Sequence, residues 1–462
     1  MRITPTVDAM NEVSAHSSSG HSTHDRLKRI GFIATGARLL QLALRAVVVP
    51  ISISLLGTND YGYWLAVGSF ATWFTVSDLG IGQLALSQLA ERVGADDEAG
   101  ARNILHLARR LYMSLAAIIA VLFAAGAASS ISTRLIIGDR VVAHPGEIDK
   151  CFLIVGLCMT VAMAMNAAPL LNNVLLKTER IYIASTVAPL LGLLILALVN
   201  GVTHRISLVT YAWIMSLPSA IGAVCQFLFT FRTERRYRPK RQQGRSIALR
   251  GLLSSSTSLI VIQLADLAIY FAPSVLIARF WGPGYLTMYG VTASVFMIGV
   301  NLCFGWGQPH IAAYAVELQR RRFSWILTQH RSLLQKTGGF MLLVGLFLIA
   351  LGPPLIRIYT ANRVHISRDL VACMAIFYCL IVVSQQNGFL LLGLKMERTR
   401  AIIQALNATA MLGGVYLARQ LNSFPALFIC ICITLCFDFI IAARGTRSRL
   451  HAAASAVPAQ TW

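Results

Sequence analysis

Twelve apolar runs, each long enough to cross a bilayer, recur along this chain and limit what it can fold into. A run of about 20 apolar residues spans the hydrocarbon core as an α-helix, because in lipid each backbone polar group has to be hydrogen-bonded within the segment. The predicted spans are residues 31–56, 62–90, 111–136, 151–176, 181–203, 207–231, 252–279, 286–311, 337–358, 370–394, 401–419 and 424–443. The sequence therefore predicts an all-α integral membrane protein with about 12 transmembrane helices.

Charged residues make up only 13% of the 462 positions, and hydrophobic residues make up 56%. A typical soluble protein carries about 25% charged residues, so much of the surface of this protein has to face lipid. The 9 cysteines are an odd number without a Cys-x-x-Cys pair, which favours buried thiols over a disulfide framework. No P-loop, His-Glu-x-x-His or Gly-x-Ser-x-Gly motif is present, so we expect neither an enzyme nor a cofactor.

Lys and Arg are distributed unevenly between the two sides of the predicted membrane. With a cytoplasmic N-terminus, the cytoplasmic loops and tails carry about three times as many of them as the opposite side. Both termini are therefore predicted to be cytoplasmic. The net charge of +21 is then an orientation signal beside anionic lipid, and no nucleic-acid partner is expected. Segment 92–110, acidic at its start and basic at its end, is predicted to be a short amphipathic helix on the inner surface.

The chain is predicted to consist of two related halves that share a pattern: a Pro, an apolar run, a Gly, and then Tyr-Gly opening the next helix. The pattern occurs at Pro50, Gly57 and Tyr61-Gly62, and again at Pro273, Gly282 and Tyr289-Gly290. Six helices per half keep both halves in one orientation, so the repeat axis should lie along the membrane normal. The alternative is chance similarity between apolar helices. The predicted domains are a disordered cytoplasmic tail (1–29), an N-terminal six-helix bundle (30–231), a basic cytoplasmic linker (232–250), a C-terminal six-helix bundle (251–443) and a second cytoplasmic tail (444–462).

Three ionisable residues lie inside the first two predicted spans. Arg38, Gln41 and Arg45 have i, i+3, i+7 spacing, which places them on one face of a helix. Asp78, in the second span, lies at a depth between those of the two arginines. Each charge at the middle of a bilayer costs roughly 2.5–3.5 kcal/mol. We therefore expect these groups to face a water-filled interior; the alternative is a buried Asp78–Arg ion pair that only orders the helices.

A second polar triple occurs in the C-terminal half. Gln263, Asp266 and Tyr270 repeat the spacing of the first triple at an offset of 225 residues, counted from Arg38 to Gln263. The two faces are predicted to face each other across a central space, with a cationic N-terminal wall and one carboxylate on the other wall. The remaining polar residues at membrane depth are interpreted as interhelical hydrogen-bonding groups. They are Asn166, Asn301, Gln308, His310 and the successive amides Gln385, Gln386 and Asn387, while Asp438 and Glu317 are predicted to be interfacial.

The first 92 residues contain a set of short motifs. They are Leu55-Leu56-Gly57 with Asp60-Tyr61-Gly62, then Ser77-Asp78-Leu79-Gly80-Ile81-Gly82, and Leu89-Ala90-Glu91-Arg92. Together with twelve spans and a cytoplasmic N-terminus, these motifs resemble the polysaccharide transporter family. That family contains the O-antigen and exopolysaccharide flippases of the multidrug/oligosaccharidyl-lipid/polysaccharide exporter superfamily. An arginine that often follows the Asp-Leu-Gly segment in the family is replaced by Ser87 in this sequence.

The resemblance implies a V-shaped pair of six-helix bundles in the bacterial inner membrane. By alternating access it would move polyprenyl-diphosphate-linked oligosaccharide to the outer leaflet for surface polysaccharide synthesis. An anionic diphosphate head needs cationic partners once it leaves water, which Arg38 and Arg45 would supply. The lipid tail would stay in the bilayer through a gap between the halves. The predicted substrate-binding residues are Arg38, Gln41, Arg45, Asp78, Gln263, Asp266 and Tyr270.

The superfamily also implies coupling to H⁺ or Na⁺, with Asp78 and Asp266 as the candidate residues, and no bound metal is expected. The expected partners are the lipid-linked oligosaccharide, membrane lipids, and a polysaccharide polymerase with its chain-length machinery. The transport unit is expected to be a monomer.

Three rival functions remain open. A multidrug or toxin antiporter of the same superfamily would need an acidic cavity for cationic substrates, whereas this interior sets Arg38 and Arg45 against Asp78 and Asp266. A polysaccharide polymerase or ligase needs a large outer loop, and the longest one predicted here runs only from Gly138 to Asp149. A scaffold without transport activity would leave the buried charges unexplained.

Overall fold

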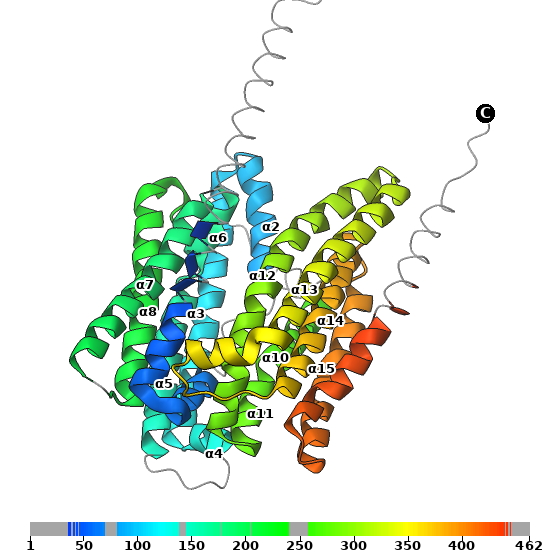
Figure 1. Cartoon of the computed structure of the whole chain (residues 1–462). Helices are drawn as coiled ribbons and strands as arrows, with labels where there is room; N and C mark the ends of the chain where they lie inside the picture. The colour runs from blue at the N-terminus through cyan, green and yellow to red at the C-terminus, as the bar shows by residue number, and fades with distance from the viewer. Residues whose placement is uncertain are drawn as a thin grey trace, which may run out of the picture.

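A computed structural model gives the fold of the protein. The structure describes residues 36–37, 40–41, 43–44, 46–69, 81–137, 145–175, 177–203, 205–239, 257–438, 440–441 and 444. Within these ranges all regular secondary structure is helical, as Figure 1 shows.

In the N-terminal half, the helical residues 46–69 are followed by seven labelled α-helices. These are α2 (Ile81–Gly94), α3 (Glu98–Ala128), α4 (Ile131–Ile137), α5 (Pro145–Ala164), α6 (Ala167–Val174), α7 (Thr178–Val202) and α8 (Leu208–Thr233). A 3-10 turn, η1 (Arg235–Tyr237), follows α8. The helices α5 and α6 follow each other directly and are bent by 42° at the break between them.

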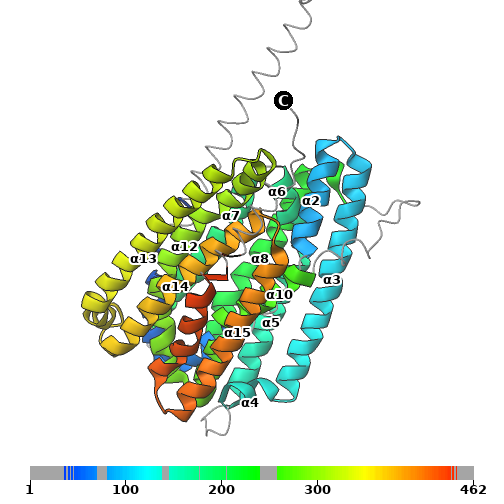
Figure 2. The same cartoon turned by 90° about the vertical axis from the view of Figure 1, so that its right-hand side faces the viewer.

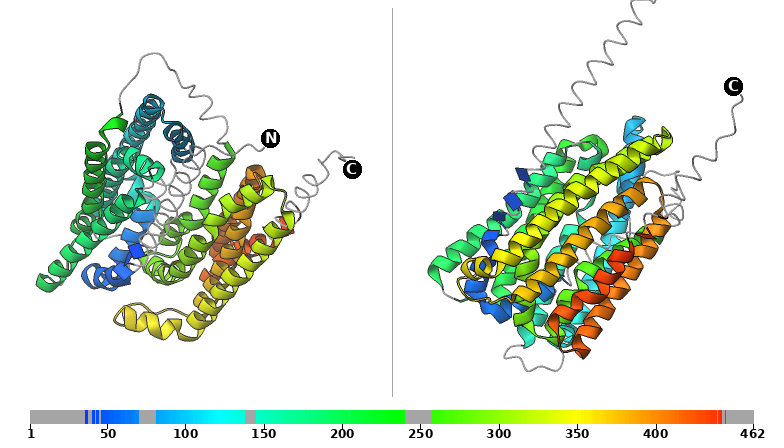
Figure 3. Two further views of the ribbon diagram at one scale, coloured as in Figure 1. Left: turned by 90° about the horizontal axis from the view of Figure 1, so that it is seen from above. Right: turned by 45° about the vertical axis from the view of Figure 1, so that its right-hand side comes forward.

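The C-terminal half repeats this organisation. Its helices are α10 (Thr257–Tyr270), α11 (Ala272–Phe280), α12 (Pro283–Gln319), α13 (Phe323–Tyr359), α14 (Arg368–Gly393) and α15 (Glu397–Gln420), then the 3-10 turn η2 (Phe424–Phe428) and a last helix that continues to Asp438. The helices of each half pack mainly against one another. Seen from above, they form two groups (Figure 3, left).

The predicted spans agree with the helices that the structure describes. Among these residues, eight helices are long and apolar enough to cross a membrane, and the bent pair α5–α6 makes nine. The helix 46–69 and α2 fall within or beside the first two predicted spans, and the apolar helix Phe424–Asp438 covers the last one. The prediction of an all-α integral membrane protein is confirmed.

Two predictions about connecting segments are wrong. Segment 92–110 is not a separate surface helix, because its residues from Glu98 onward form the first turns of α3. Asp97 begins that helix by accepting a hydrogen bond from the Gly100 N–H (2.8 Å), and no Gly or Pro interrupts residues 101–125. Segment 320–336, predicted to connect two spans, is helical from Phe323 as the start of α13. Both helices extend beyond the roughly 30 Å hydrocarbon core, at about 46 Å and 55 Å.

A glycine in the left-handed backbone region interrupts the helical residues 46–69 of the N-terminal half, and another separates α11 from α12 in the C-terminal half. Gly57 has φ +81° and Gly282 has φ +105°. Glycine adopts such angles without steric cost, so it is the usual residue just past a helix C-terminus. These are the two glycines that the offset of 225 residues aligns.

The two glycine turns pack against each other. Thr287 Oγ1 donates to the Thr58 carbonyl (2.7 Å). Gly62 lies on the backbone of Pro283, where an added Cβ would be 2.2 Å from the carbonyl oxygen. The offset of 225 exchanges these contacts, since Thr58 corresponds to Pro283 and Gly62 to Thr287. Reciprocal contacts of this kind are the signature of a two-fold axis, which here relates the two halves.

The bundles meet at the end of the molecule that carries these turns. Leu65 packs on Gly290, at positions that the same offset relates. Arg363 donates to the carbonyls of Ile53 and Ser54 (2.9 and 3.0 Å), in the turn that precedes Gly57. Arg363 thus satisfies carbonyls that a helix end leaves without an intrahelical partner. At the same end α4 of one half packs against α11 of the other, at the bottom of the molecule in Figure 1. We call this set of contacts the seam.

Candidate functional site

Three of the predicted substrate-binding residues lie outside the described ranges, and their roles stay predictions. They are Arg38, Arg45 and Asp78. Gln41, on the same predicted face, donates to the hydroxyls of Ser185 (2.9 Å) and Thr186 (3.2 Å) on α7. The amide of Gln41 is therefore bonded to a helix of its own bundle.

The three predicted residues of the C-terminal half lie on α10, and α14 and α15 converge on two of them. Gln385 Nε2 on α14 donates to Asp266 Oδ1 (3.4 Å) and to the Tyr270 hydroxyl (3.2 Å). Gln404 on α15 donates to the same oxygen of Asp266. Gln263 lies one turn before Asp266 and is partly buried. The structure thus brings Asp266 and Tyr270 into one polar cluster inside the C-terminal bundle.

A buried arginine that the spacing analysis missed supplies the positive charge of this cluster. Arg400 is only 2% exposed. Its guanidinium donates to Gln385 Oε1 (2.8 Å) and to the Ser384 carbonyl (3.4 Å). Its charge acts on both Asp266 and Asp438. The single positive charge of Arg400 therefore offsets part of the negative charge of two carboxylates.

Asp438 closes the cluster from the last helix. Its side chain accepts a hydrogen bond from Ser384 Oγ, and the residue is 1% exposed. Asp438 is buried among helices, so its predicted interfacial position stays a prediction, and Arg400 lies near the start of α15. The side chains of Asp438 and Arg400 are both buried within the C-terminal bundle. A signal was present on α15, where Arg400, Gln404 and Asn407 have i, i+4, i+7 spacing and share one face.

The three successive amides of α14 point to three different neighbours. Gln385 joins the cluster just described. Gln386 Nε2 donates to the Cys303 carbonyl of α12 (3.0 Å), and Asn387 Oδ1 is 3.1 Å from His330 Nε2 of α13. The interpretation of these amides as interhelical hydrogen-bonding groups is confirmed. Figure 2 shows α14 running between α13 and α15.

The cluster has the chemistry to hold a proton or a monovalent cation. Gln404 Oε1 is buried without a hydrogen-bond partner in the described residues, and Asp438 is a buried carboxylate beside Ser384 and Asn407. A buried carboxylate is costly, and binding a proton or a cation reduces that cost. Within the same residues, no group of three or more His, Cys, Asp or Glu is arranged to hold a metal ion.

A cavity of about 410 Å³ lies between the two bundles, where Ala46 of the N-terminal half meets α12 and α13. We call it the seam cavity. Its wall includes Ala46, Ser294 and Asn301, together with Phe347 and Tyr359. Tyr359 donates its hydroxyl proton to the Ala46 carbonyl (2.6 Å) and so joins the bundles beside the cavity. Phe347 is half-exposed, which places the cavity at the lipid-facing surface.

Comparison with known proteins identifies the fold. No protein-family model matches the chain, and no curated protein matches its sequence. Solved structures do match. One is the inward-facing conformation of a multidrug resistance MATE family transporter of the MOP superfamily. It gives a TM-score of 0.74 and 15% identity, and the match covers 93% of this chain and 100% of that one. The protein has the MATE fold.

Two other matches refine this result. The outward-facing conformation of a multidrug resistance MATE family transporter gives a TM-score of 0.65, with 15% identity over 93% of this chain and 97% of that one. A MOP superfamily transporter from Pyrococcus furiosus, whose description notes a reversed polarity of the binding pocket, gives 0.65 with 15% identity over 93% and 95%. All three matches cover nearly the whole chain and share one fold.

Proposed function

We propose that this protein is a membrane transporter working by alternating access, and that it moves a polyprenyl-diphosphate-linked oligosaccharide. The MATE fold supports the first part, because two bundles that meet at one end can rock around a site between them. The motifs of the first 92 residues support the second part, together with Arg38 and Arg45 as cationic partners for a diphosphate.

The seam cavity is the observation that carries the choice of a lipid-linked substrate. An amphiphile crosses the membrane with its head inside the protein and its tail in lipid, so it needs an apolar passage between the bundles. The seam cavity lies between them at the lipid-facing surface, and most of its wall is apolar. A water-soluble drug would not need such a passage.

The hydrogen bonding of Asp266 argues against the rival antiporter of cationic drugs. Such a substrate would need a carboxylate that is free to pair with it. Asp266 already accepts hydrogen bonds from Gln385 and Gln404, and the charge of Arg400 opposes its own. Asp266 is therefore not free to pair with a cationic substrate.

We assign the coupling of transport to an ion to the C-terminal cluster. Asp266 remains the candidate from the sequence, and Asp438 joins it because it is a buried carboxylate that shares the charge of Arg400. Taking up H⁺ or Na⁺ there would change the charge that Arg400 faces. Asp78 stays a second candidate in the N-terminal half.

A leaflet-resolved assay of lipid-linked glycans tests the proposed function. A bacterial strain without this gene should accumulate repeat units that face the cytoplasm, and the native protein should restore their export. The Arg45→Ala variant should fail to restore it at an unchanged protein level. If the units of the deletion strain reach the outer face but stay unpolymerised, the polymerase function is correct instead. If only resistance to cationic drugs is lost, the protein is an antiporter.

We also propose that the membrane is the bacterial inner membrane and that both termini are cytoplasmic. The distribution of Lys and Arg supports this orientation. Reporter fusions at Pro145 and after Arg241 should then report opposite sides of the membrane. Two fusions on the same side would contradict the topology.

A further inference from the structure

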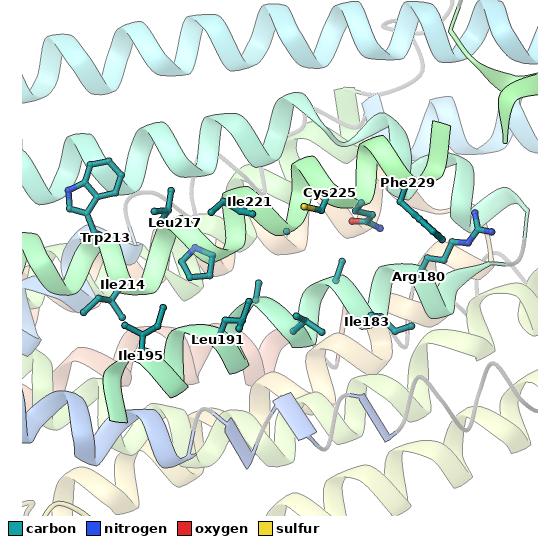
Figure 4. A pocket seen from close by; sticks show the side chains of 16 residues that line it. Arg180, Ile183, Leu191, Ile195, Trp213, Ile214, Leu217, Ile221, Cys225 and Phe229 are labelled. Atoms are coloured by element: carbon teal, nitrogen blue, oxygen red, sulfur yellow. The ribbon is translucent and has the colours of Figure 1, made fainter. Parts of the chain in front are cut away.

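A groove of about 790 Å³ runs along the outer surface of α7 and α8 (Figure 4). Arg180 and Phe229 lie at one end of the groove, and Ile195 and Trp213 lie at the other. The α7 wall from Arg180 to Ile195 is about 23 Å long at 1.5 Å per residue. Almost all side chains that line the groove are apolar.

Small residues form the floor of the groove and large residues form its walls. Gly222 and Ala188 lie on the floor, where an added Cβ on Gly222 would be 3.4 Å from the Ala188 methyl group. The helices therefore approach closely there. On the walls, Ile183 is 60% exposed and Ile221 is 53% exposed. Apolar side chains this exposed on a membrane helix face lipid, so the groove is open to the bilayer.

Cations surround one end of the groove. Arg180 and Lys177 both bind Glu234, which neutralises one of the two charges. Arg232 follows Phe229 by three residues on α8, so it continues the same wall of the groove, and it is exposed. This end is also the one predicted to be cytoplasmic, where the anionic lipids of the inner leaflet are found.

A polar group inside the groove has no partner. Gln226 lines the groove, and its Nε2 is buried without a hydrogen-bond acceptor in the described structure. Gln226 precedes Arg232 by six residues, which places it about 9 Å deeper along α8. An amide donor in an apolar wall is satisfied by a ligand that presents an acceptor at this depth.

We propose that this groove binds one anionic glycerophospholipid of the inner leaflet. One acyl chain lies between α7 and α8, the phosphate lies between Arg180 and Arg232, and an ester carbonyl accepts the hydrogen bond of Gln226. The ester group distinguishes a glycerophospholipid from a polyprenyl phosphate as the bound lipid. In a glycerophospholipid an ester carbonyl lies just below the phosphate, whereas in a polyprenyl phosphate the hydrocarbon begins there. The site is therefore independent of the transported substrate.

Photo-crosslinking of the full-length protein tests this site. The protein is reconstituted in phosphatidylcholine vesicles with a trace of phosphatidylglycerol that carries a diazirine on one acyl chain, and labelled peptides are mapped by mass spectrometry. We expect label on residues 183–195 and 213–229. Unlabelled phosphatidylglycerol should compete about 30-fold better than phosphatidylcholine, as two cations near the membrane surface imply. Equal competition by the two lipids would overturn the proposal, and so would stronger competition by polyprenyl phosphate.

Three variants separate the charge, the carbonyl contact and the apolar groove. Arg180→Gln with Arg232→Gln should remove the preference for phosphatidylglycerol, whereas Arg320→Gln with Arg321→Gln, at exposed arginines elsewhere, should keep it. Gln226→Leu should reduce severalfold the advantage of phosphatidylglycerol over polyprenyl phosphate as a competitor, because only the glycerophospholipid has an ester carbonyl. Cys225→Phe fills the groove without a change of charge and should lower its labelling severalfold; Leu198→Phe, on α7 but not in the groove wall, is its control. Labelling that survives Cys225→Phe would show an annular lipid only.

Discussion

One buried arginine sets the electrostatics of the C-terminal bundle. Arg400 is held by Gln385 and the Ser384 carbonyl, and its charge acts on two carboxylates, Asp266 and Asp438, that come from helices far apart in the sequence. The fold makes room for it at Gly388, where an added Cβ would be 2.4 Å from Arg400 Cζ. Charges buried in this way are strongly interdependent, because removing one leaves its partners uncompensated.

Removing that charge should destabilise the protein strongly. We expect Arg400→Leu to lower the free energy of unfolding by about 3–5 kcal/mol, since Asp266 and Asp438 are then left without a cation. Thermal unfolding of the detergent-purified protein measures this. Adding Asp438→Asn to Arg400→Leu should recover part of the loss. Arg398→Leu, two residues away and exposed, is the control and should change little. Equal effects of Arg398→Leu and Arg400→Leu would contradict this account.

The sequence alone predicts Asp266 as a member of this cluster, but it does not predict Arg400. Asp266 stands out because it lies within an apolar span, where any charge is expensive. Arg400 does not stand out, because it follows Lys395 and Arg398 in a basic segment that also marks the cytoplasmic side. Its burial depends on the packing of α14 against α15 and on the space at Gly388, neither of which a single sequence displays.

At the scale of helices, hydropathy locates the apolar centre of a span but not its polar extension. The first turns of α3 and α13 are polar, and they are helical because no Pro interrupts them and, at α3, Asp97 caps the helix. The ends of α7 and α8 are joined in a similar polar region. There Glu234, just past α8, binds Lys177 and Arg180 at the start of α7.

This ion pair should stabilise the helix ends in a pH-dependent way. Burial raises the pKa of Glu234, but Lys177 and Arg180 outweigh it and lower the pKa below its ordinary value. The stabilisation is then complete at neutral pH and is lost as the pH falls through the lowered pKa. We expect Glu234→Gln to reduce stability by about 1–3 kcal/mol at pH 7.

The difference between the native protein and Glu234→Gln should shrink below about pH 4, because the native carboxylate is then protonated too. Unfolding temperatures measured between pH 3 and pH 8 test this, with Glu179→Gln in the first turn of α7 as the control. A difference that stays constant over this range would show that the charge of Glu234 does not matter.

At the scale of the whole molecule, the weak repeat in the sequence has a structural counterpart at the seam. The offset of 225 residues aligns Gly57 with Gly282 and exchanges the contact of Gly62 on Pro283 with that of Thr58 and Thr287. The capping of Ile53 and Ser54 by Arg363 could not be predicted, because it joins residues about 310 positions apart that no local pattern relates.

The seam should control the balance between the two conformations of a transporter. Gly62→Ala would place a Cβ 2.2 Å from the Pro283 carbonyl oxygen, and a backbone atom cannot yield as a flexible side chain can. Overpacking of this kind costs about 1–3 kcal/mol, and only the arrangement joined at the seam bears the cost. The population should therefore shift by roughly 5-fold to 150-fold toward the arrangement that is open at this end.

Nitroxide labels at the exposed residues Thr203 and Asn422, one in each bundle near this end, measure the shift as a longer distance between them. Gly68→Ala, on the same helix at a position where an added Cβ meets no atom within 4 Å, is the matched control. Thr287→Val removes one hydrogen bond without adding a clash, so it should shift the population less than Gly62→Ala. The same distance distribution for Gly62→Ala and Gly68→Ala would show that the contact of the glycine turns does not hold the bundles together. The contacts of Arg363 and of α4 with α11 would then have to stabilise the closed arrangement.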